Sequence, residues 1–342
     1  MKRNVPVLLA AIAFTALAAF AASTPSKSLL ILSKGELTLS IVDPVSLKVL
    51  ASMPSGPDPH EVVASSDGKF AYISNYGSGQ YNTITVVDLI AQKTLEAVDL
   101  GGLRGPHGLM YSGGKVWFTA EPNKAVGTLD GVTRKVDWVL GTGQDRTHMV
   151  WVASDQKTFY TTNVNAATVS IIERAAPAAG RGGRGPGRGS PQGEWSQTVV
   201  PVGKGAEGFD VSPDGKELWT ADAADGTVTV IDLASKKVVK TIAADVKGAN
   251  RLKFTPDGKK VFVSTLSGPN ATVIDPATRA VVKTIAIGKG AAGIEMQPDG
   301  SRVFIACTPD NYVTIIDLKT LAVTGRLEAG KNPDGMAWSE IR

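Results

Sequence analysis

The sequence predicts an all-β fold, a seven-bladed β-propeller made of four-stranded antiparallel blades. A phrase of four short strands recurs along the chain with a period of about forty residues, which is typical of propellers. Asp-Gly turns separate alternating apolar runs inside the copies. The first and last copies are incomplete in complementary ways, so together they make one blade. Strand-rich units without a helical period disfavour an α/β alternative.

Three late copies show the repeat best, and they are Gly208–Ile242, Arg251–Ile285 and Gly293–Leu327. Their first hairpins turn at Pro213-Asp214-Gly215, Pro256-Asp257-Gly258 and Pro298-Asp299-Gly300. Such turns predict hairpins because glycine adopts a positive φ without steric cost. The third strand of each copy ends in an acidic residue, namely Asp43, Asp88, Asp130, Glu173, Asp232, Asp275 and Asp317. We interpret these residues as turn caps.

The two ends of the propeller are predicted to share one blade. The first unit begins with an apparent second strand, Leu29–Ser33, and lacks an innermost strand. The chain ends with an unpaired first strand, Gly335–Ile341. Joining the two segments completes blade one and removes the open edge between the first and last blades.

The N-terminus has the three parts of a secretory signal peptide. Met1-Lys2-Arg3 is basic, Val5 to Phe20 is apolar, and Ala19-Phe20-Ala21 fits the small-x-small cleavage rule. We expect residues 1–21 to be removed, residues 22–342 to form the propeller, and the mature protein to be periplasmic or secreted without a membrane span. The alternative is an uncleaved anchor, for which the apolar run is slightly short.

Composition disfavours several other classes of protein. The formal net charge of +4 is too small to predict a nucleic-acid partner without a basic stripe. The lone Cys307 cannot form an internal disulfide, so the fold depends on its hydrophobic core, and we interpret Cys307 as part of that core. The absence of a Cys-x-x-Cys-His motif excludes covalent haem. We expect a monomer.

One segment, Ala175–Gly193, breaks the repeat between the third and fourth strands of blade four. It contains the Gly- and Arg-rich tract Arg181–Gly189. This composition cannot bury a core, so residues 175–193 are predicted to be a disordered loop. Such tracts can contact nucleic acid, but in an exported protein we favour a solvated basic linker.

The repeats resemble those of the YVTN β-propeller family. The resemblance is carried by Ala71-Tyr72-Ile73-Ser74-Asn75 with Asn82–Asp88, and by Thr227–Asp232 with Val238–Ile242. In blade three, Gly105–Leu109 and Lys115–Glu121 also resemble the repeat of streptogramin B lyases, which are metal-dependent propellers that open a cyclic lactone. The export signal departs from those cytoplasmic enzymes. The histidine and arginine motifs of propeller lactonases have no clear copy here.

All three histidines occupy the same position of the repeat, where a connector enters the innermost strand. Aligning the copies gives the set His60, His107, His148, Glu207, Asn250, Ala292 and Asp334. Because blades converge toward the axis, these side chains can meet. Imidazoles with a carboxylate suit Zn, Cu, Fe or Ni. We therefore predict one divalent metal ion bound by His60, His107, His148 and Glu207; alternatively, each histidine caps its own strand.

Two further sets of residues are candidates for the same face. Polar residues near the ends of second strands are Asn75, Glu121, Asn163 and Asp222. Of these, Glu121 and Asp222 are candidate proton-transfer groups, while Asn75 and Asn163 are candidate ligand contacts; all four could instead cap loops. Connector cations are Arg104, Lys204, Lys247, Lys289 and Lys331. These would attract an anionic ligand, unless they are simply solvated.

Three functions are consistent with this pattern. The first is an exported binding or scaffold propeller that holds a small anionic ligand, a metal ion or a protein partner on its channel face. The second is a metal-dependent lyase or lactonase that acts on a cyclic ester or anionic small molecule, because a metal polarises a carbonyl or activates water. The third is an accessory subunit of an electron-transfer enzyme.

Overall fold

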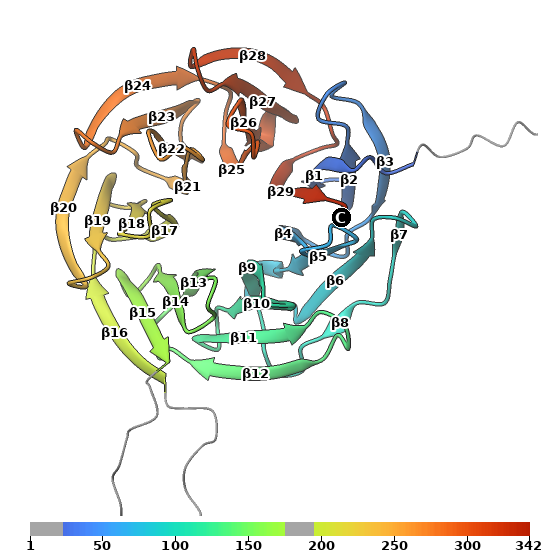
Figure 1. The fold of residues 1–342 in the computed structure, drawn as a ribbon, viewed down its shortest axis with the longest axis horizontal. Coiled ribbons are helices and arrows are strands. Elements are labelled where there is room, and N and C mark those ends of the chain that lie inside the picture. The colour runs from blue at the N-terminus through green and yellow to red at the C-terminus, as the bar shows by residue number, and fades with distance from the viewer. Residues whose placement is uncertain (1–22, 175–194) are drawn as a thin grey trace, which may run out of the picture.

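Seven antiparallel sheets surround a central axis in the computed structural model, like blades around a hub (Figure 1). The structure describes residues 23–174 and 195–342. The predicted signal peptide and the predicted loop at 175–193 lie outside these ranges. Within them, no helix is long and apolar enough to cross a membrane. The predicted fold class is confirmed.

Each blade runs from an innermost strand at the axis to an outer strand at the rim. Blade one contains β29 (Pro333–Glu340), β1 (Lys27–Ser33), β2 (Thr38–Val42) and β3 (Val49–Pro54). Blade two contains β4 (Pro59–Ala64), β5 (Phe70–Asn75), β6 (Thr83–Asp88), β7 (Lys93–Thr94) and β8 (Val98–Asp99). Blade three contains β9 (Pro106–Ser112), β10 (Lys115–Ala120), β11 (Ala125–Asp130) and β12 (Val136–Gly141). Blades four and five contain β13 (Thr147–Val152), β14 (Thr158–Asn163), β15 (Thr168–Arg174) and β16 (Trp195–Pro201); and β17 (Ala206–Val211), β18 (Glu217–Asp222), β19 (Thr227–Asp232) and β20 (Lys237–Ala243). Blades six and seven contain β21 (Ala249–Phe254), β22 (Val261–Thr265), β23 (Asn270–Asp275) and β24 (Ala280–Ala286); and β25 (Ala291–Met296), β26 (Arg302–Cys307), β27 (Tyr312–Asp317) and β28 (Ala322–Leu327). Two 3₁₀ turns, η1 (Gly77–Gly79) and η2 (Thr308–Asp310), follow β5 and β26.

The two ends of the propeller pair as predicted. β29 lies against β1 in antiparallel register, with Leu29 opposite Trp338 and Ile31 opposite Met336. The sheet order β29-β1-β2-β3 therefore builds blade one from both ends of the chain. This pairing covers the inner edge of β1, which would otherwise present unpaired backbone groups.

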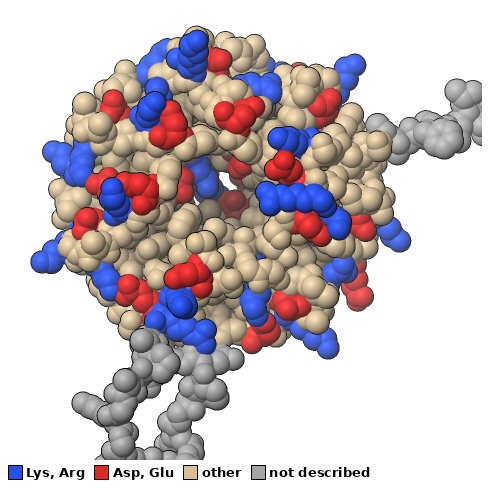
Figure 2. Space-filling model, in the orientation of Figure 1, with Lys and Arg blue, Asp and Glu red and all other residues tan. Residues whose placement is uncertain are grey.

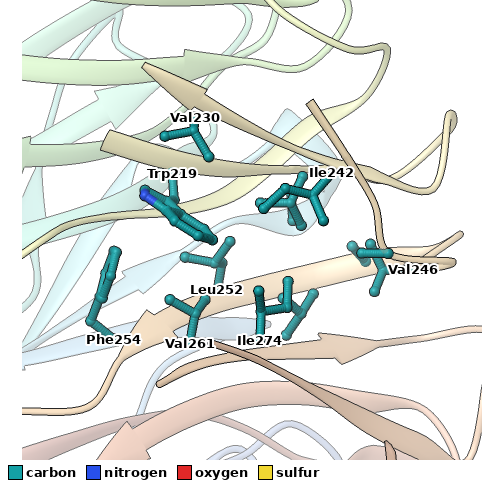
Figure 3. Packing of buried hydrophobic residues seen from close by; sticks show 13 residues of the cluster. Trp219, Val230, Ile242, Val246, Leu252, Phe254, Val261 and Ile274 are labelled. Atoms are coloured by element: carbon teal, nitrogen blue, oxygen red, sulfur yellow. The ribbon is translucent and has the colours of Figure 1, made fainter. Parts of the chain in front are cut away.

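The hydrophobic core lies between neighbouring blades rather than at the axis. Figure 3 shows the cluster between blades five and six, where Trp219 and Val230 face Leu252 and Val261. Trp219 is fully buried. Similar clusters fill the other spaces between blades, so each sheet is covered on both faces except at its rim. Cys307 is buried in one of them, between blades six and seven.

The predicted turns have the expected geometry. Gly215, Gly258 and Gly300 have φ values of 71°, 68° and 73°, which favour glycine. Six of the seven acidic residues that end third strands accept a backbone N–H of their own turn, namely Asp43, Asp88, Asp130, Asp232, Asp275 and Asp317. Glu173 instead contacts Lys236 Nζ. The repeated aspartates are therefore turn caps.

Deleting residues 332–342 is expected to lower the melting temperature by about 10 °C or more. The truncation removes β29 and exposes the inner edge of β1, and each kcal/mol of lost stability lowers the melting temperature of a large domain by roughly 2–4 °C. Differential scanning calorimetry measures this change. Removal of Arg342 alone is the control. A melting temperature within a few degrees of the full chain would contradict closure by β29.

Candidate functional site at the mouth of the channel

The innermost strands begin in the same register, and this places the histidines together. In blades two to five, the first residue of the innermost strand pairs with the last residue of the second strand of the same blade. These first residues are Pro59, Pro106, Thr147 and Ala206. The next residues of blades one to seven are Asp334, His60, His107, His148, Glu207, Asn250 and Ala292. They form a ring at one mouth of the channel. Figure 2 views the disk along this axis, with acidic and basic atoms visible in the central opening.

The three imidazoles form a continuous row across blades two to four. The ring centroids of His60 and His107 lie 4.3 Å apart, and those of His107 and His148 lie 3.8 Å apart. Tyr76, from the loop after β5, packs edge-on against His107 with centroids 5.0 Å apart. His107 and His148 are each 1% exposed. The rings therefore meet in a desolvated layer.

His148 lies between two carboxylates. Its Nδ1 contacts Glu121 Oε1, and its Nε2 lies 2.6 Å from Glu207 Oε2. The guanidinium of Arg146 joins the same two acids, with Nε 3.4 Å from Glu121 and Nη1 3.5 Å from Glu207. The hydroxyl of Tyr76 donates to the other oxygen of Glu121. Two cations and two carboxylates thus form one closed cluster.

A second charged group surrounds His60 on the other side of the row. Lys34 Nζ contacts His60 Nδ1 and lies 3.0 Å from Asp58 and 3.2 Å from Asp334. His60 Nδ1 also lies 3.4 Å from Asp334. Lys34 follows β1 as Tyr76 follows β5, so these two residues and Glu121 occupy one position in blades one to three.

The surroundings divide the three histidines into two charge states. Burial opposes the charged form of His148, but Glu207 and Glu121 outweigh it and raise its pKa to about 9. Burial lowers the pKa of His107 well below its usual value, and the neighbouring His148 adds to this effect. Burial and Lys34 likewise lower the pKa of His60. At neutral pH His148 is an imidazolium, while His60 and His107 are neutral.

The connector before each innermost strand is held in the left-handed backbone region. Four blades have glycine there, namely Gly105, Gly205, Gly248 and Gly290. Blades one, two and four instead have Asn332, with φ of 52°, Asp58, with φ of 41°, and Arg146, with φ of 56°. Such conformations are costly for residues with side chains and cluster at functional sites. Asp58 and Arg146 each contribute a charge to one of the two clusters.

The buried nitrogen Nδ1 of His107 has no hydrogen-bond partner in the described part of the chain. His107 is shared by two groups whose potential ligand atoms lie within 4.8 Å of one another. One group is His107, Glu121 and His148, all buried, and the other is His60, Glu61 and His107. The predicted histidines therefore converge. Glu207 contacts His148 but belongs to neither group.

The predicted ring of second-strand polar residues combines two different positions. Asn75, Asn163 and Asp222 are the last residues of their strands, and each bonds hydroxyls of the third strand of its own blade. Asp222 accepts from Thr229 and Thr227, and burial raises its pKa to about 6 despite these bonds. Glu121 is one residue later in the repeat, because Ala120 is the residue that pairs with the third strand. Glu121 therefore contacts His148, whereas Asn75, Asn163 and Asp222 form hydrogen bonds within their own blades.

The connector cations stay away from the histidines. Their side chains are exposed on the loops, and the set is Arg104, Lys204, Lys247, Lys289 and Lys331. Lys204 and Lys289 donate backbone N–H groups to Asp225 and Asp310, each at 2.8 Å. Arg104 Nη1 donates to the carbonyl of Gln80 at 3.1 Å. The cations beside the histidine row are instead Lys34, which contacts His60, and Arg146, which contacts the carboxylates around His148, and the sequence pattern predicted neither of them.

Comparison with known proteins supports the fold. No protein-family model and no curated protein sequence matches this chain. Hydrazine synthase from Kuenenia stuttgartiensis is 19% identical with a TM-score of 0.65, covering 82% of this chain and 89% of that one. A candidate 6-phosphogluconolactonase from Bacteroides uniformis is 16% identical with a TM-score of 0.72, covering 91% and 99%. Dihydro-heme d1 dehydrogenase is 17% identical with a TM-score of 0.63, covering 92% and 75%. At these identities the likeness is one of fold.

In the metal-free protein, ¹⁵N NMR should show the His148 ring doubly protonated at pH 7 and losing its proton near pH 9. His60 and His107 should remain neutral down to well below pH 6.5 because burial opposes their charged forms. Glu207→Gln should lower the pKa of His148 by at least about one unit, since it removes a charge that stabilises the imidazolium. Glu36→Gln, near Lys34 but remote from His148, is the control. A normal pKa for His148 would contradict the described cluster.

Proposed function

We propose that this chain is an exported binding propeller of the YVTN-repeat type, and that it holds a divalent transition-metal ion at the mouth of its channel. His107, His148 and Glu121 would provide the ligand atoms. Two imidazoles and one carboxylate suit zinc and other late first-row metals and leave coordination positions open for a ligand. Export rests on the basic, apolar and small-residue pattern of residues 1–21.

The observation that carries the proposal is the orphaned nitrogen of His107. A buried polar atom without a hydrogen-bond partner lowers the stability of the fold by about 1–3 kcal/mol. Such an atom in a native protein therefore indicates a bound partner, such as a metal ion. The atom belongs to a neutral ring, which is the form that binds metals. A second imidazole and a carboxylate have potential ligand atoms within 4.8 Å of one nitrogen of this ring. A metal ion would satisfy all three groups at once.

Metal binding would compete with the proton on His148. Both nitrogens of His148 face carboxylates, so one contact must open and one proton must leave before this ring can bind a metal. Glu207 and Arg146 would then orient the remaining groups, as outer partners of metal ligands commonly do. Affinity is therefore expected to fall as the pH drops and the proton returns.

The same exchange favours an anionic partner. The charges of His148, Arg146, Glu121 and Glu207 cancel in the metal-free cluster. Replacing one proton by a divalent ion leaves one net positive charge in a desolvated site. An anion bound at an open metal position would restore neutrality, and the partly exposed Arg146 lies beside that position. A small carboxylate or phosphate is the ligand class that fits.

The purified mature protein, loaded with Zn²⁺ and dialysed, is expected to hold about one metal ion per chain by elemental analysis. His107→Ala should abolish this binding, because it removes the residue shared by both groups. Asn250→Ala, at the same ring position in blade six, should retain the ion and serves as the matched control. Circular dichroism checks the fold of each variant. Wild-type protein that binds none of Zn, Mn, Fe, Co or Ni would refute the proposal.

A second candidate function is metal-dependent opening of a cyclic ester. It is favoured by the contacts of Glu121, whose two oxygens touch His148 and the Tyr76 hydroxyl. With the ion on His60, Glu61 and His107, Glu121 could accept a proton from water that attacks the ester carbonyl. The ring C–O bond would break, and the leaving oxygen would take a proton.

If this second function is correct, metal-loaded protein should hydrolyse a panel of lactones. Glu121→Gln should lower kcat at least about a hundredfold, because general bases contribute on the order of 10²–10⁴ in rate. Asp222→Asn should leave kcat unchanged, since Asp222 bonds its own blade. A pH-stat assay measures the acid released. If metal-loaded protein hydrolyses no lactone, the second function is wrong and metal binding remains the proposed function.

A further inference from the structure

Below the histidine ring, the next residue of the innermost strand is glycine in four blades and a large side chain in the other three. Blades three, five, seven and one carry Gly108, Gly208, Gly293 and Gly335. A Cβ at Gly108 would lie 2.6 Å from the His148 carbonyl oxygen, and one at Gly335 would lie 2.3 Å from that of His60. These strands therefore touch the backbone of the next blade. The intervening blades carry Glu61, Met149 and Arg251.

An ion pair crosses the channel at this level. Arg251 Nη2 contacts Glu61 Oε1, and their side chains are 6% and 14% exposed. Glu61 belongs to blade two and Arg251 to blade six, which are not neighbours, so the pair spans the opening. The histidine mouth lies on one side of this bridge.

On the other side lies a cavity of about 480 Å³, lined by the second halves of the innermost strands. Its size falls within the usual range for small-molecule sites. Tyr111, Trp151 and Trp338 line it from blades three, four and one, and each is half-buried. Lys253 and Glu295 line it from blades six and seven. One side of the cavity is aromatic and the other is charged.

The two charged groups have no bonded partner in the described residues. No ion pair within 4 Å and no hydrogen bond engages the side chain of Lys253 or Glu295 there. The adjacent Asp210 is occupied, because its two oxygens accept the N–H groups of Val211 and Phe254, each at 3.0 Å. Burial raises the pKa of Glu295 to about 7, with Lys253 opposing and Asp210 adding to the shift. Lys253 and Glu295, on the innermost strands of neighbouring blades, thus present an amine and a carboxyl group to the cavity with no hydrogen bond and no ion pair within 4 Å among the described residues.

We propose that this cavity is a second binding site, separate from the histidine mouth, for a small zwitterion with an apolar or aromatic body. The carboxylate of such a molecule would bind Lys253, and its ammonium group would bind Glu295. Its body would pack against Trp151, Trp338 and Tyr111, whose ring faces also favour a cation nearby. Apolar α-amino acids have this chemistry. A ligand with a single charge would meet only one of the two protein groups and would therefore bind less tightly.

Isothermal titration calorimetry on the mature protein at pH 8 tests this proposal with L-phenylalanine and two analogues. Phenethylamine lacks the carboxylate, and 3-phenylpropionate lacks the ammonium group. L-phenylalanine is expected to bind at least about tenfold more tightly than either analogue. Lys253→Met should remove its preference over phenethylamine, and Glu295→Gln should remove its preference over 3-phenylpropionate. This crossed pattern requires each charge to meet its own partner.

Exposed residues of the same blades provide matched controls. Lys259→Met in blade six and Glu328→Gln after β28 should leave both preferences intact. All titrations use metal-free protein, so that failure of the metal proposal would not affect this result. The same titration with L-leucine and L-tryptophan tests zwitterions whose apolar side chains are smaller and larger than that of L-phenylalanine. The proposal is overturned if none of the three amino acids binds at millimolar concentration, or if a singly charged analogue binds as tightly as the zwitterion.

Discussion

Antiparallel pairing between β29 and β1 is the interaction on which the rest of the molecule depends. It closes the ring of blades, and closure holds seven innermost strands around one axis. Asp334 on β29 then reaches His60 on β4, and Gly335 lies against the backbone of the same residue. Without this contact the channel would have an open side. The charged groups at its mouth would return to water, where their mutual attraction is weak.

Burial explains why the mouth is organised as paired charges. Taking a carboxylate or an imidazolium out of water costs several kcal/mol unless a partner compensates. His148 and Arg146 compensate Glu121 and Glu207, and Lys34 compensates Asp58 and Asp334. His107 stands between the two clusters and has no such compensation at Nδ1. His148 Nε2 also lacks a hydrogen bond, but it lies 2.6 Å from the Glu207 carboxylate, so His107 Nδ1 is the atom at which a ligand would contribute most.

The Glu61–Arg251 bridge places the two candidate sites in physical contact. Glu61 is a potential metal ligand with His60 and His107, and it is also the partner of Arg251 at the top of the cavity. Glycine in the other four blades makes this arrangement possible, since it leaves space for three side chains in one layer.

Sequence by itself determined the seven blades, the shared blade and the common position of the three histidines. These features repeat along the chain, and a repeat with a known register can be aligned without coordinates. Tertiary structure decided which polar residues join the histidines. In the sequence, Asn75 and Glu121 both follow an apolar second strand, but Glu121 lies one residue later in the repeat than Asn75. A shift of one residue in a strand reverses the face on which a side chain lies. Asp222 therefore accepts hydrogen bonds within its own blade, and the charged clusters around the histidines are completed by Tyr76, Arg146 and Lys34. The pairing of Glu61 with Arg251 also depends on tertiary structure, because those residues are 190 positions apart in the chain and meet across the closed ring.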